Sequence, residues 1–411
     1  MKSGYKQTEI GVIPEDWDIG SLKEAFPRLN AGVSVNSDER AVSDYYVLKT
    51  SAVRNGKVNI REAKPVVVSD YPRLKCPVKK GSIIISRMNT PAMVGECGYS
   101  ATDATDTFLP DRLWQGEPSS PDYDFQWLNY LLNTEKYSAA IRATATGTSN
   151  SMKNIAKDRL LEIAVPKPPR PEQERIAVAL SDMDEMITWL EKLIAKKKAI
   201  KQGTMQELLT GKRRLPGFTG KWITVSIGEC GSLSKESINP LIYPSEYFWE
   251  YSMPAFDEGK SPTKQLGGNM HSNRIRITGS VLLFNKLNVR QKRIWLVNHC
   301  PRNSVCSSEF LPYCSNALDL RLLKYILETD KTTSDFVGMS TGTSNSQKRI
   351  TPDAFLEYTV YIPKEIDEQY AIADNLESIE KECTTLVRKR NKAYQIKQGM
   401  MQQLLTGKKR L

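Results

Sequence analysis

Three segments of this chain contain residue types that could catalyse a reaction. Asn239-Pro240-Leu241-Ile242-Tyr243 has part of the Asn-Pro-Pro-Tyr loop of adenine methyltransferases, but it lacks the second proline and no glycine-rich cofactor loop precedes it. Glu62-Ala63-Lys64 and Glu258-Gly259-Lys260 have the Glu-x-Lys end of a nuclease motif, but neither has a Pro-Asp dipeptide shortly upstream. We interpret the first segment as a chance match and the two triplets as surface charge.

A zinc site is the other chemistry to consider. His299, Cys300, Cys306 and Cys314 are close in sequence, but the intervals between the cysteines lack the Cys-x-x-Cys knuckle, so buried thiols are the simpler interpretation. The chain has seven cysteines, an odd number, only two histidines, and no Gly-x-x-x-x-Gly-Lys-Thr loop. The sequence therefore predicts no catalytic residue, no metal site, no disulfide and no cofactor bound by this chain.

The balance of charge indicates a partner instead. Fifty-eight Lys and Arg residues against 47 Asp and Glu give a net charge of +11, which is typical of proteins that bind a polyanion such as nucleic acid. The mean hydropathy of -0.44 and the lack of an apolar run of about 18 residues predict no membrane partner. With the unpaired cysteines, these values predict a cytoplasmic protein.

The chain contains an internal repeat, which decides its organisation. The segment 201–215 returns 196 positions later as 397–411 with 12 of 15 residues identical. Thr146-Gly147-Thr148-Ser149-Asn150-Ser151 returns as Thr341 to Ser346, and each copy is followed by a lysine and an isoleucine. At 411 residues the chain is long enough for two or three domains, so two tandem copies of one unit are expected.

A long helix is predicted near the end of each copy. In the first, apolar residues step by alternating intervals of four and three, the a/d pattern of a coiled coil, at Ile176, Leu180, Met183, Ile187, Leu190 and Ile194. The same positions shifted by 196 are Ile372, Leu376, Ile379, Cys383, Leu386 and Arg390, of which only the last breaks the pattern. With Pro171 at the start and Gly211 near the end, the first helix should span about 40 residues, or ~60 Å.

Charge predicts how the two helices pair. Residues 171–186 carry five acids and one base, whereas 187–214 carry two acids and eight bases. Residues 367–382 carry six acids and one base, and 383–411 carry eight bases and no acid. Antiparallel pairing places each acidic half against a basic half, although the same distribution also complements each helix dipole.

The predicted fold is therefore two mixed α/β (α+β) domains separated by a long antiparallel two-helix coiled coil, with an internal pseudo-two-fold repeat. The expected boundaries are 1–165 for the first domain, 166–214 for its helical spacer, 215–362 for the second domain and 363–411 for the second spacer. Strands are expected at 45–48, 82–86 and 280–284, and helices at 125–132 and 320–327. Outside the flanking elements the two domains hardly resemble each other in sequence.

The chain resembles the specificity subunits of type I restriction-modification systems. The residues that carry the resemblance are the two Pro-Gln-Ile-Ala blocks (165–177 and 362–373), the Leu-Leu-Thr-Gly-Lys endings and the Ile-Pro-x-x-Trp opening at 13–17. They occur in the order that the family has them and cover nearly the whole chain.

The resemblance implies a non-catalytic subunit whose two target-recognition domains each read one half of a split DNA sequence at a fixed separation. It implies double-stranded DNA and modification subunits as partners, most simply two of the latter, which supply S-adenosylmethionine chemistry on adenine. It also implies restriction subunits that use ATP and Mg²⁺. No cofactor is expected in this chain.

DNA contacts are expected from polar and basic residues at the ends of strands, where loops can reach a groove. The candidates in the first domain are Lys49, Thr50, Arg54, Lys57, Arg87 and Asn89. Those in the second domain are Arg274, Arg276, Asn285, Lys286, Asn288, Arg290 and Lys292. Arg87 and Lys286 follow corresponding strands after Gly81-Ser82 and Gly279-Ser280.

The shared Thr-Gly-Thr-Ser-Asn-Ser-x-Lys elements cannot distinguish one half-site from the other, because both domains carry them. They either contact phosphates or form a turn that leads into the helix. The phosphate candidates are Thr148, Asn150 and Lys153 in the first copy and Thr343, Asn345 and Lys348 in the second.

Two other functions compete with this prediction. A coiled-coil scaffold whose basic charge is incidental would not need two unlike domains. A self-sufficient metal-dependent nuclease would need the catalytic motifs that the sequence lacks.

Overall fold

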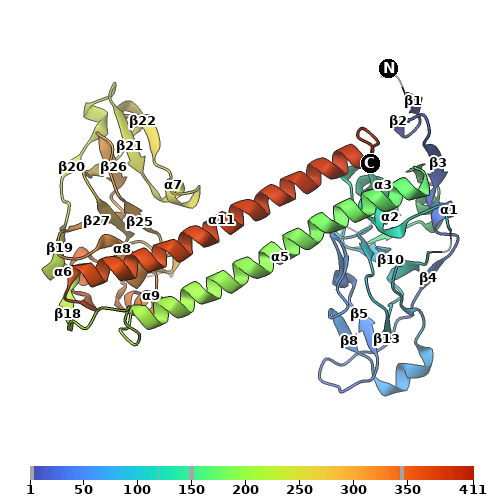
Figure 1. The fold of residues 1–411 in the computed structure, drawn as a ribbon, viewed down its shortest axis with the longest axis horizontal. Helices are drawn as coiled ribbons and strands as arrows, with labels where there is room; N and C mark the ends of the chain where they lie inside the picture. Colours follow the sequence, from blue (N-terminus) through green and yellow to red (C-terminus); the bar gives the residue numbers. More distant parts are fainter. Residues whose placement is uncertain (1–3, 119, 148–151, 343–346) are drawn as a thin grey trace. The chain divides into compact units, whose positions relative to one another are not determined.

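The computed structural model describes residues 4–118, 120–147, 152–342 and 347–411 (Figure 1). The chain divides into two compact units. Unit 1 comprises Met1–Glu191 and Arg388–Leu411, and unit 2 comprises Lys192–Val387. Each unit therefore contains one mixed α/β domain and parts of both long helices.

Unit 1 begins with a hairpin and is mostly β structure. Its strands are β1 (Tyr5–Thr8), β2 (Gly11–Pro14), β3 (Asp18–Ser21), β4 (Leu29–Ala31), β5 (Tyr46–Leu48), β6 (Val53–Arg54), β7 (Gly56–Val58), β8 (Ala63–Pro65), β9 (Pro77–Val78), β10 (Ile83–Ser86), β11 (Met88–Asn89), β12 (Cys97–Tyr99), β13 (Ala104–Phe108), β14 (Leu113–Gly116), β15 (Ala145–Thr146), β16 (Lys153–Ile155) and β17 (Ala164–Lys167). Its short helices are α1 (Leu22–Ala25), α2 (Phe125–Leu132), α3 (Glu135–Ala143) and α4 (Lys157–Leu161).

Unit 2 has the same mixture of elements. Its strands are β18 (Trp222–Ser226), β19 (Gly231–Leu233), β20 (Ser237–Ile238), β21 (Tyr247–Tyr251), β22 (Thr263–Leu266), β23 (Arg274–Arg276), β24 (Val281–Asn285), β25 (Ile294–Val297), β26 (Ser304–Ser307), β27 (Phe310–Ser315) and β28 (Thr359–Pro363). Its short helices are α6 (Ile227–Cys230), α7 (Met253–Asp257), α8 (Leu320–Leu327), α9 (Asp330–Met339) and α10 (Pro352–Glu357).

The two units share a topology that is not evident from their sequences. In unit 1 the buried strand β10 pairs antiparallel with β14, which pairs with β4; in unit 2 β24 pairs with β27, which pairs with β19. Each unit also has a second sheet that contains one parallel pair, β5 with β13 and β21 with β26. The central strands Ile83–Ser86 and Val281–Asn285 are buried along their whole length and form the middle of each core. The predicted two α/β domains are confirmed.

The two long helices are α5 (Arg170–Leu208) and α11 (Ile366–Leu404), each of 39 residues. The predicted a/d positions face the core: Ile176, Leu180, Ile372 and Leu376 are at most 1% exposed. In the middle of α5, Ile187, Leu190 and Ile194 are also buried, whereas Ile379 and Leu386 of α11 are half-buried. No helix in the described part of the chain is long and apolar enough to cross a membrane.

Ion pairs within each unit show that α5 and α11 run antiparallel and side by side (Figure 1). In unit 1, Lys397 near the end of α11 contacts Asp184 near the start of α5 at 2.8 Å. In unit 2, Lys201 near the end of α5 contacts Glu380 near the start of α11, also at 2.8 Å. The two pairs are related by the 196-residue repeat, and a tyrosine of α2 or α8 donates to each carboxylate. The antiparallel pairing predicted from charge is confirmed.

A second repeated cluster closes each unit. In unit 1, Trp17 Nε1 donates to the buried Glu172 at 3.0 Å, and Arg410 Nη2 donates to the same carboxylate at 2.7 Å. In unit 2, Trp222 and Arg214 make the corresponding bonds to Glu368, the latter at 2.6 Å. Because Arg410 ends the second repeat and Arg214 ends the first, each unit is completed by the ending of the other repeat.

Candidate nucleic-acid interface

In unit 1 a small three-stranded sheet gathers three of the predicted contact residues. Strand β11 pairs with β16, so Asn89 lies opposite Lys153, and β16 pairs in turn with β15. Arg87, just before β11, is held by its backbone on both sides: its N–H donates to the carbonyl of Arg112 at 3.1 Å, and its carbonyl accepts from Ile155 N–H at 2.8 Å. The end of β10 and the segment after the shared element are therefore neighbours.

Unit 2 has the same arrangement on different side chains. Leu287 and Thr341 both form bridges to Arg349, and the Asn288 N–H donates to the carbonyl of Lys348 at 2.9 Å. The Lys286 N–H donates to the carbonyl of Glu309, and its carbonyl accepts from Ile350 N–H. Lys286 thus occupies the backbone position of Arg87, which the sequence placed only at the end of a corresponding strand.

In unit 1 the shared element begins with Thr146 at the end of β15, and its lysine, Lys153, begins β16. Thr148, Asn150, Thr343 and Asn345 lie outside the described residues. Lys153, at the end of the first element, donates from Nζ to the carbonyl of Gly147 at 2.5 Å.

Arg87 has an environment suited to a fixed donor. Its guanidinium lies 5.3 Å from the centre of the Trp114 ring, and its Nε is buried with no hydrogen-bond partner among the described residues. A guanidinium stacked on an aromatic ring loses less conformational entropy when it binds a ligand. Asn89, also half-buried, donates to Ser86 Oγ at 3.2 Å.

The other candidates of unit 1 lie on the turns beside this sheet. Arg54 and Lys57 are exposed and face each other in the β6–β7 hairpin. The hairpin turn is tied to Glu96, whose carboxylate accepts from the Asn55 N–H at 3.1 Å, and the Glu96 carbonyl accepts from Ser86 at 2.9 Å. Lys49 pairs with Glu39 at 3.3 Å, and Thr50 begins a short 3-10 turn.

Several candidates of unit 2 use their polar atoms within the protein. Arg274 contacts Glu250 at 2.5 Å, with side chains only 15% and 9% exposed, and Arg276 contacts Glu236 at 2.9 Å. Asn285 is buried, and its Oδ1 accepts from the Leu287 N–H at 2.8 Å, which shapes the turn after β24.

The turn between β24 and β25 carries the last two candidates. Lys292 contacts Asp330 at 2.6 Å, and this contact holds the pKa of Asp330 below its usual value. Arg290 is exposed. Lys292 is therefore paired within the protein, whereas the side chain of Arg290 is exposed to a partner.

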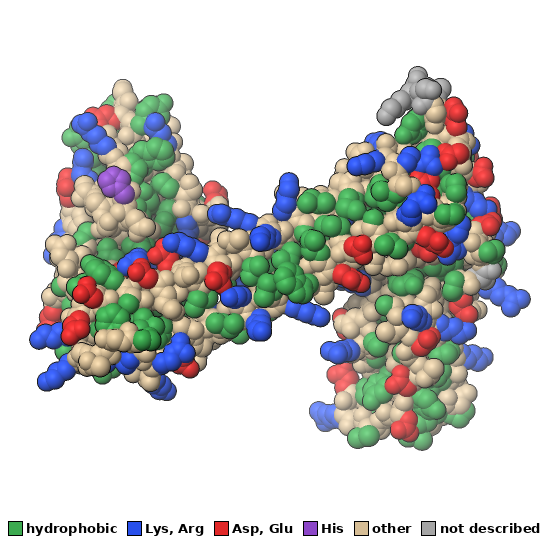
Figure 2. Space-filling model, viewed as in Figure 1, with side chains coloured by type: hydrophobic (Ala, Val, Ile, Leu, Met, Phe, Trp, Pro, Cys, Tyr) green, Lys and Arg blue, Asp and Glu red, His purple; other side chains and the backbone are tan. Residues whose placement is uncertain are grey.

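The surface charge is dispersed. On the face of the molecule shown in Figure 2, Lys and Arg side chains are interspersed with Asp and Glu over both units and do not gather into one patch. This face therefore carries no continuous basic surface.

The segments that resembled catalytic motifs have structural roles. Asn239 caps a 3-10 turn through its side chain, and Glu62 accepts from Ser51 Oγ at 2.8 Å. Burial raises the pKa of Cys300 to about 11 and that of Cys306 to about 12, so both stay as thiols at neutral pH. No group of three or more metal-ligating side chains occurs among the described residues.

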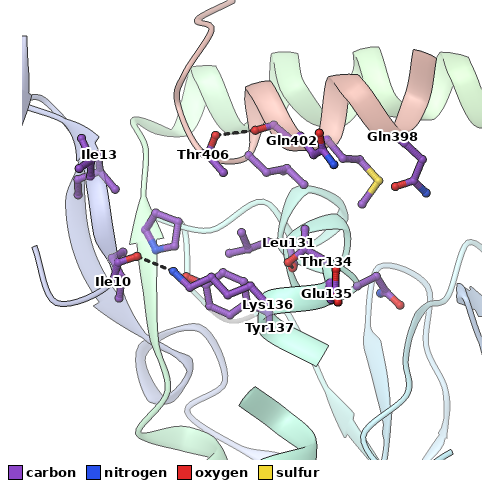
Figure 3. A pocket seen from close by; sticks show the side chains of 15 residues that line it. Ile10, Ile13, Leu131, Thr134, Glu135, Lys136, Tyr137, Gln398, Gln402 and Thr406 are labelled. Carbon is purple, nitrogen blue, oxygen red and sulfur yellow. Dashed lines mark hydrogen bonds between the residues drawn. The ribbon is translucent and has the colours of Figure 1, made fainter. Parts of the chain in front are cut away.

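A cavity of about 400 Å³ lies in unit 1 under the β1–β2 hairpin (Figure 3). Ile10 and Ile13 of the hairpin, the α2–α3 turn and the end of α11 line it. Lys136 donates from Nζ to the Ile10 carbonyl at 2.5 Å, which ties the hairpin to α3. Its lining combines aliphatic side chains with amides and hydroxyls, and we interpret it as space left where the hairpin covers the helix end.

Comparison with known proteins indicates the family. Residues 14–202 match the family model described as the type I restriction modification DNA specificity domain. Two Methanocaldococcus jannaschii proteins are similar: the putative type I restriction enzyme MjaX specificity subunit is 24% identical over 212 residues, and the MjaVIII specificity subunit is 29% identical over 216 residues. The chain is therefore similar to the type I restriction-modification specificity (S) subunits. Each alignment covers 51% of this chain and 49% of the relative, so the chain spans about half the length of these curated relatives.

The fold of the chain also matches that of a solved protein. The crystal structure of the S subunit from M. genitalium covers 98% of this chain and 99% of its own, with a TM-score of 0.61 and 15% identity. At that identity the likeness concerns the fold alone.

Sequence reasoning did not find three residues that the structure places beside the predicted contact residues. Arg112 and Glu309 bond through their carbonyls to Arg87 and Lys286, and Arg349 bridges Leu287 and Thr341. Arg349 directly follows Lys348 in the repeated element, so alignment of the two copies, with Asn154 opposite Arg349, could have found it. Arg112 and Glu309 gave no such signal, because strands bring them in from a distance.

Proposed function

We propose that this chain reads a double-stranded DNA target in two parts. The domain of unit 1 (1–165) would read one half-site and the domain of unit 2 (215–362) the other, with the helical segments 166–214 and 363–411 setting the distance between them. The observation that carries this proposal is a common backbone with a different side chain at the same half-buried position. Arg87 stands in unit 1 where Lys286 stands in unit 2, whereas the asparagines Asn89 and Asn288 follow them in both units.

The residues proposed to contact DNA fall into two groups. Arg87, Asn89, Lys286 and Asn288 are proposed as base contacts, because each follows a buried strand that fixes its backbone. Lys153, Lys348 and the threonines and asparagines of the shared elements are proposed as phosphate contacts, because both units carry them. Arg54, Lys57 and Arg290 are exposed and would add phosphate contacts at the edges. Lys49, Thr50, Arg274, Arg276, Asn285 and Lys292 stay as weaker candidates, most of them already bonded within the protein.

We further propose that the chain is not catalytic by itself. Two modification subunits would supply S-adenosylmethionine and transfer the methyl group to adenine, and restriction subunits would supply ATP- and Mg²⁺-dependent cleavage. The support is the match of residues 14–202 to the family model together with the structural roles of Asn239, Glu62 and the buried thiols. Nothing in the described residues favours the scaffold or the nuclease hypothesis over this one.

Methyl transfer from labelled S-adenosylmethionine tests the proposal. The purified chain should transfer no label to DNA, and addition of modification subunits should give transfer to a split target. The complex that carries Arg87→Ala should bind the target about 5- to 150-fold more weakly when the half-site read by unit 1 is intact. Its discrimination between sequences in the other half-site should be unchanged. Label transfer by the chain alone, or equal loss in both half-sites, would contradict the proposal.

A further inference from the structure

Comparing the two copies of the internal repeat distinguishes the contacts that hold the architecture from the positions that could read DNA. The Trp–Glu–Arg cluster and the Lys–carboxylate–Tyr cluster occur in both units at repeated positions. Residues that hold the architecture are therefore kept in both copies. A position whose backbone bonds are the same in both units but whose side chain differs is where the two units can act differently.

Three such positions lie together at the candidate interface. Arg87 corresponds to Lys286, because their backbone hydrogen bonds match. The N–H of each donates to the carbonyl of the residue before the neighbouring strand, β14 or β27, and the carbonyl of each accepts from the isoleucine after the shared element. The same bonds make Arg112 the counterpart of Glu309. The repeated sequence makes Asn154 the counterpart of Arg349.

Only unit 2 can form an ion pair between these positions. Arg349 donates from Nε and from Nη2 to the two carboxylate oxygens of Glu309, both at 3.2 Å. The counterparts in unit 1 are an arginine and a neutral asparagine, and Asn154 Oδ1 is buried with no partner among the described residues. The side chains of Arg349 and Glu309 are 47% and 23% exposed. A pair with this exposure contributes only about 0–1 kcal/mol to stability, so stability does not account for it.

The pair instead fixes the direction of the guanidinium. Glu309 occupies Nε and one hydrogen of Nη2, so the donors left over are on Nη1 and the outer side of Nη2. These two nitrogens form the end-on fork of arginine. Guanine is the base that presents two adjacent acceptors, N7 and O6, in the major groove.

We propose that Arg349, oriented by Glu309, reads a guanine through the major groove in the half-site bound by unit 2. This inference rests on the proposed DNA-reading function and names one base within it. Arg349 makes the base contact, and Glu309 is a positioning residue that acts through it. Asn154 gives unit 1 a different side chain at the same place, so the half-site of unit 1 is not read by this pair.

The test uses the full chain in complex with its modification subunits. A duplex is first selected by the wild-type complex from a random-sequence pool. Each guanine of that duplex is then replaced, one at a time, by 7-deazaguanine, which still pairs with cytosine but lacks the N7 acceptor. The wild-type complex should lose affinity at one guanine position read by Arg349, and Arg349→Ala should bind the unmodified duplex about 5- to 150-fold more weakly. The variant should no longer distinguish guanine from 7-deazaguanine at that position.

Three further variants assign the effect. Arg349→Lys keeps the charge without the fork and should not restore discrimination at that guanine. Glu309→Gln keeps one acceptor for Arg349 and should retain part of the discrimination, whereas Glu309→Ala should lose more of it. Arg293→Ala removes a similar pair, in which Nε and Nη2 contact Asp257 at 2.9 and 2.7 Å, and should leave discrimination at that guanine unchanged.

The outcomes separate the inference from the function on which it rests. If the wild-type complex selects no sequence, the proposed function is wrong. If it selects a sequence but Arg349→Ala binds all duplexes equally well or equally more weakly than wild type, only the inference is overturned, and in the second case Arg349 is a phosphate contact.

Discussion

Replacing Arg410 with alanine tests the cluster that closes unit 1. The Glu172 side chain is 2% exposed, and in wild type it accepts from Trp17 and Arg410. The variant leaves a buried carboxylate with one neutral donor. Breaking a fully buried pair costs about 3–5 kcal/mol, but Arg410 itself is 40% exposed, so water can enter the vacated space. We therefore expect a loss of about 2–3 kcal/mol in the stability of unit 1.

Hydrogen exchange followed by mass spectrometry measures this loss in each unit separately. A loss of 2–3 kcal/mol corresponds to exchange about 30- to 150-fold faster, in peptides from the start of α5 and from β1 and β2. Arg213→Ala is the matched control, because Arg213 pairs with Glu207 on the surface with side chains 57% and 50% exposed. It should change exchange by less than about fivefold.

The corresponding variant in unit 2 checks the role of the repeat. Arg214→Ala should accelerate exchange in unit 2 and leave unit 1 protected, since its carboxylate partner Glu368 is fully buried. The reasoning is wrong if Arg410→Ala behaves like Arg213→Ala, or if it accelerates exchange in both units equally.

Three more predictions concern the long helices. Although burial opposes ionisation, hydrogen bonds from Lys201 and Lys324 lower the pKa of Glu380 to about 2, so its ion pairs stabilise the fold above about pH 4.5 and are lost as pH falls towards 2. Because Glu380 is partly exposed, urea unfolding at pH 6 and pH 3 should show only about 1–2 kcal/mol more pH dependence in wild type than in Glu380→Gln. Gly407→Ala should lower the melting temperature, since Gly407 has φ of 68° and its new Cβ would lie 2.5 Å from Pro14, whereas Gly203→Ala, with open space around it, should raise stability by about 0.5–1 kcal/mol. Inserting four helical residues after both Glu191 and Val387, where the two units divide, adds ~6 Å to each helix and should lengthen the preferred gap between half-sites by one or two base pairs in binding assays with spacer variants; an unchanged gap would contradict the role of the helices in spacing.

The repeat and the helices could be predicted because their signals are local. The a/d residues and the charge halves of α5 and α11 lie within about 40 consecutive positions, and the helices 125–132 and 320–327 have the predicted bounds. Heptad spacing predicts which face of a helix is buried, and this prediction needs no information from the rest of the chain. The antiparallel direction followed from charge alone, because only that direction brings Asp184 to Lys397.

The reading surface could be predicted only in part, because strand pairing joins distant residues. Arg87 and Lys286 were found from the buried strands that precede them. Glu309 has no local signal and reaches Lys286 only through the register of β27 with β24. Arg274 shows the opposite error. Its residue type and its position after a turn predict a free donor, but its guanidinium donates to Glu250, which lies on a strand 24 residues earlier.

The exchange of endings between the two repeats gives the chain the pattern of a domain-swapped dimer whose two subunits have been fused. The ending 201–215, which closes unit 2, is identical at 12 of 15 positions to the ending 397–411, which closes unit 1. A protein consisting of residues 1–215 alone would lack an ending for its own Trp17 and Glu172, and its own ending would lack the partner that it has in unit 2. Two copies of that fragment could complete each other reciprocally.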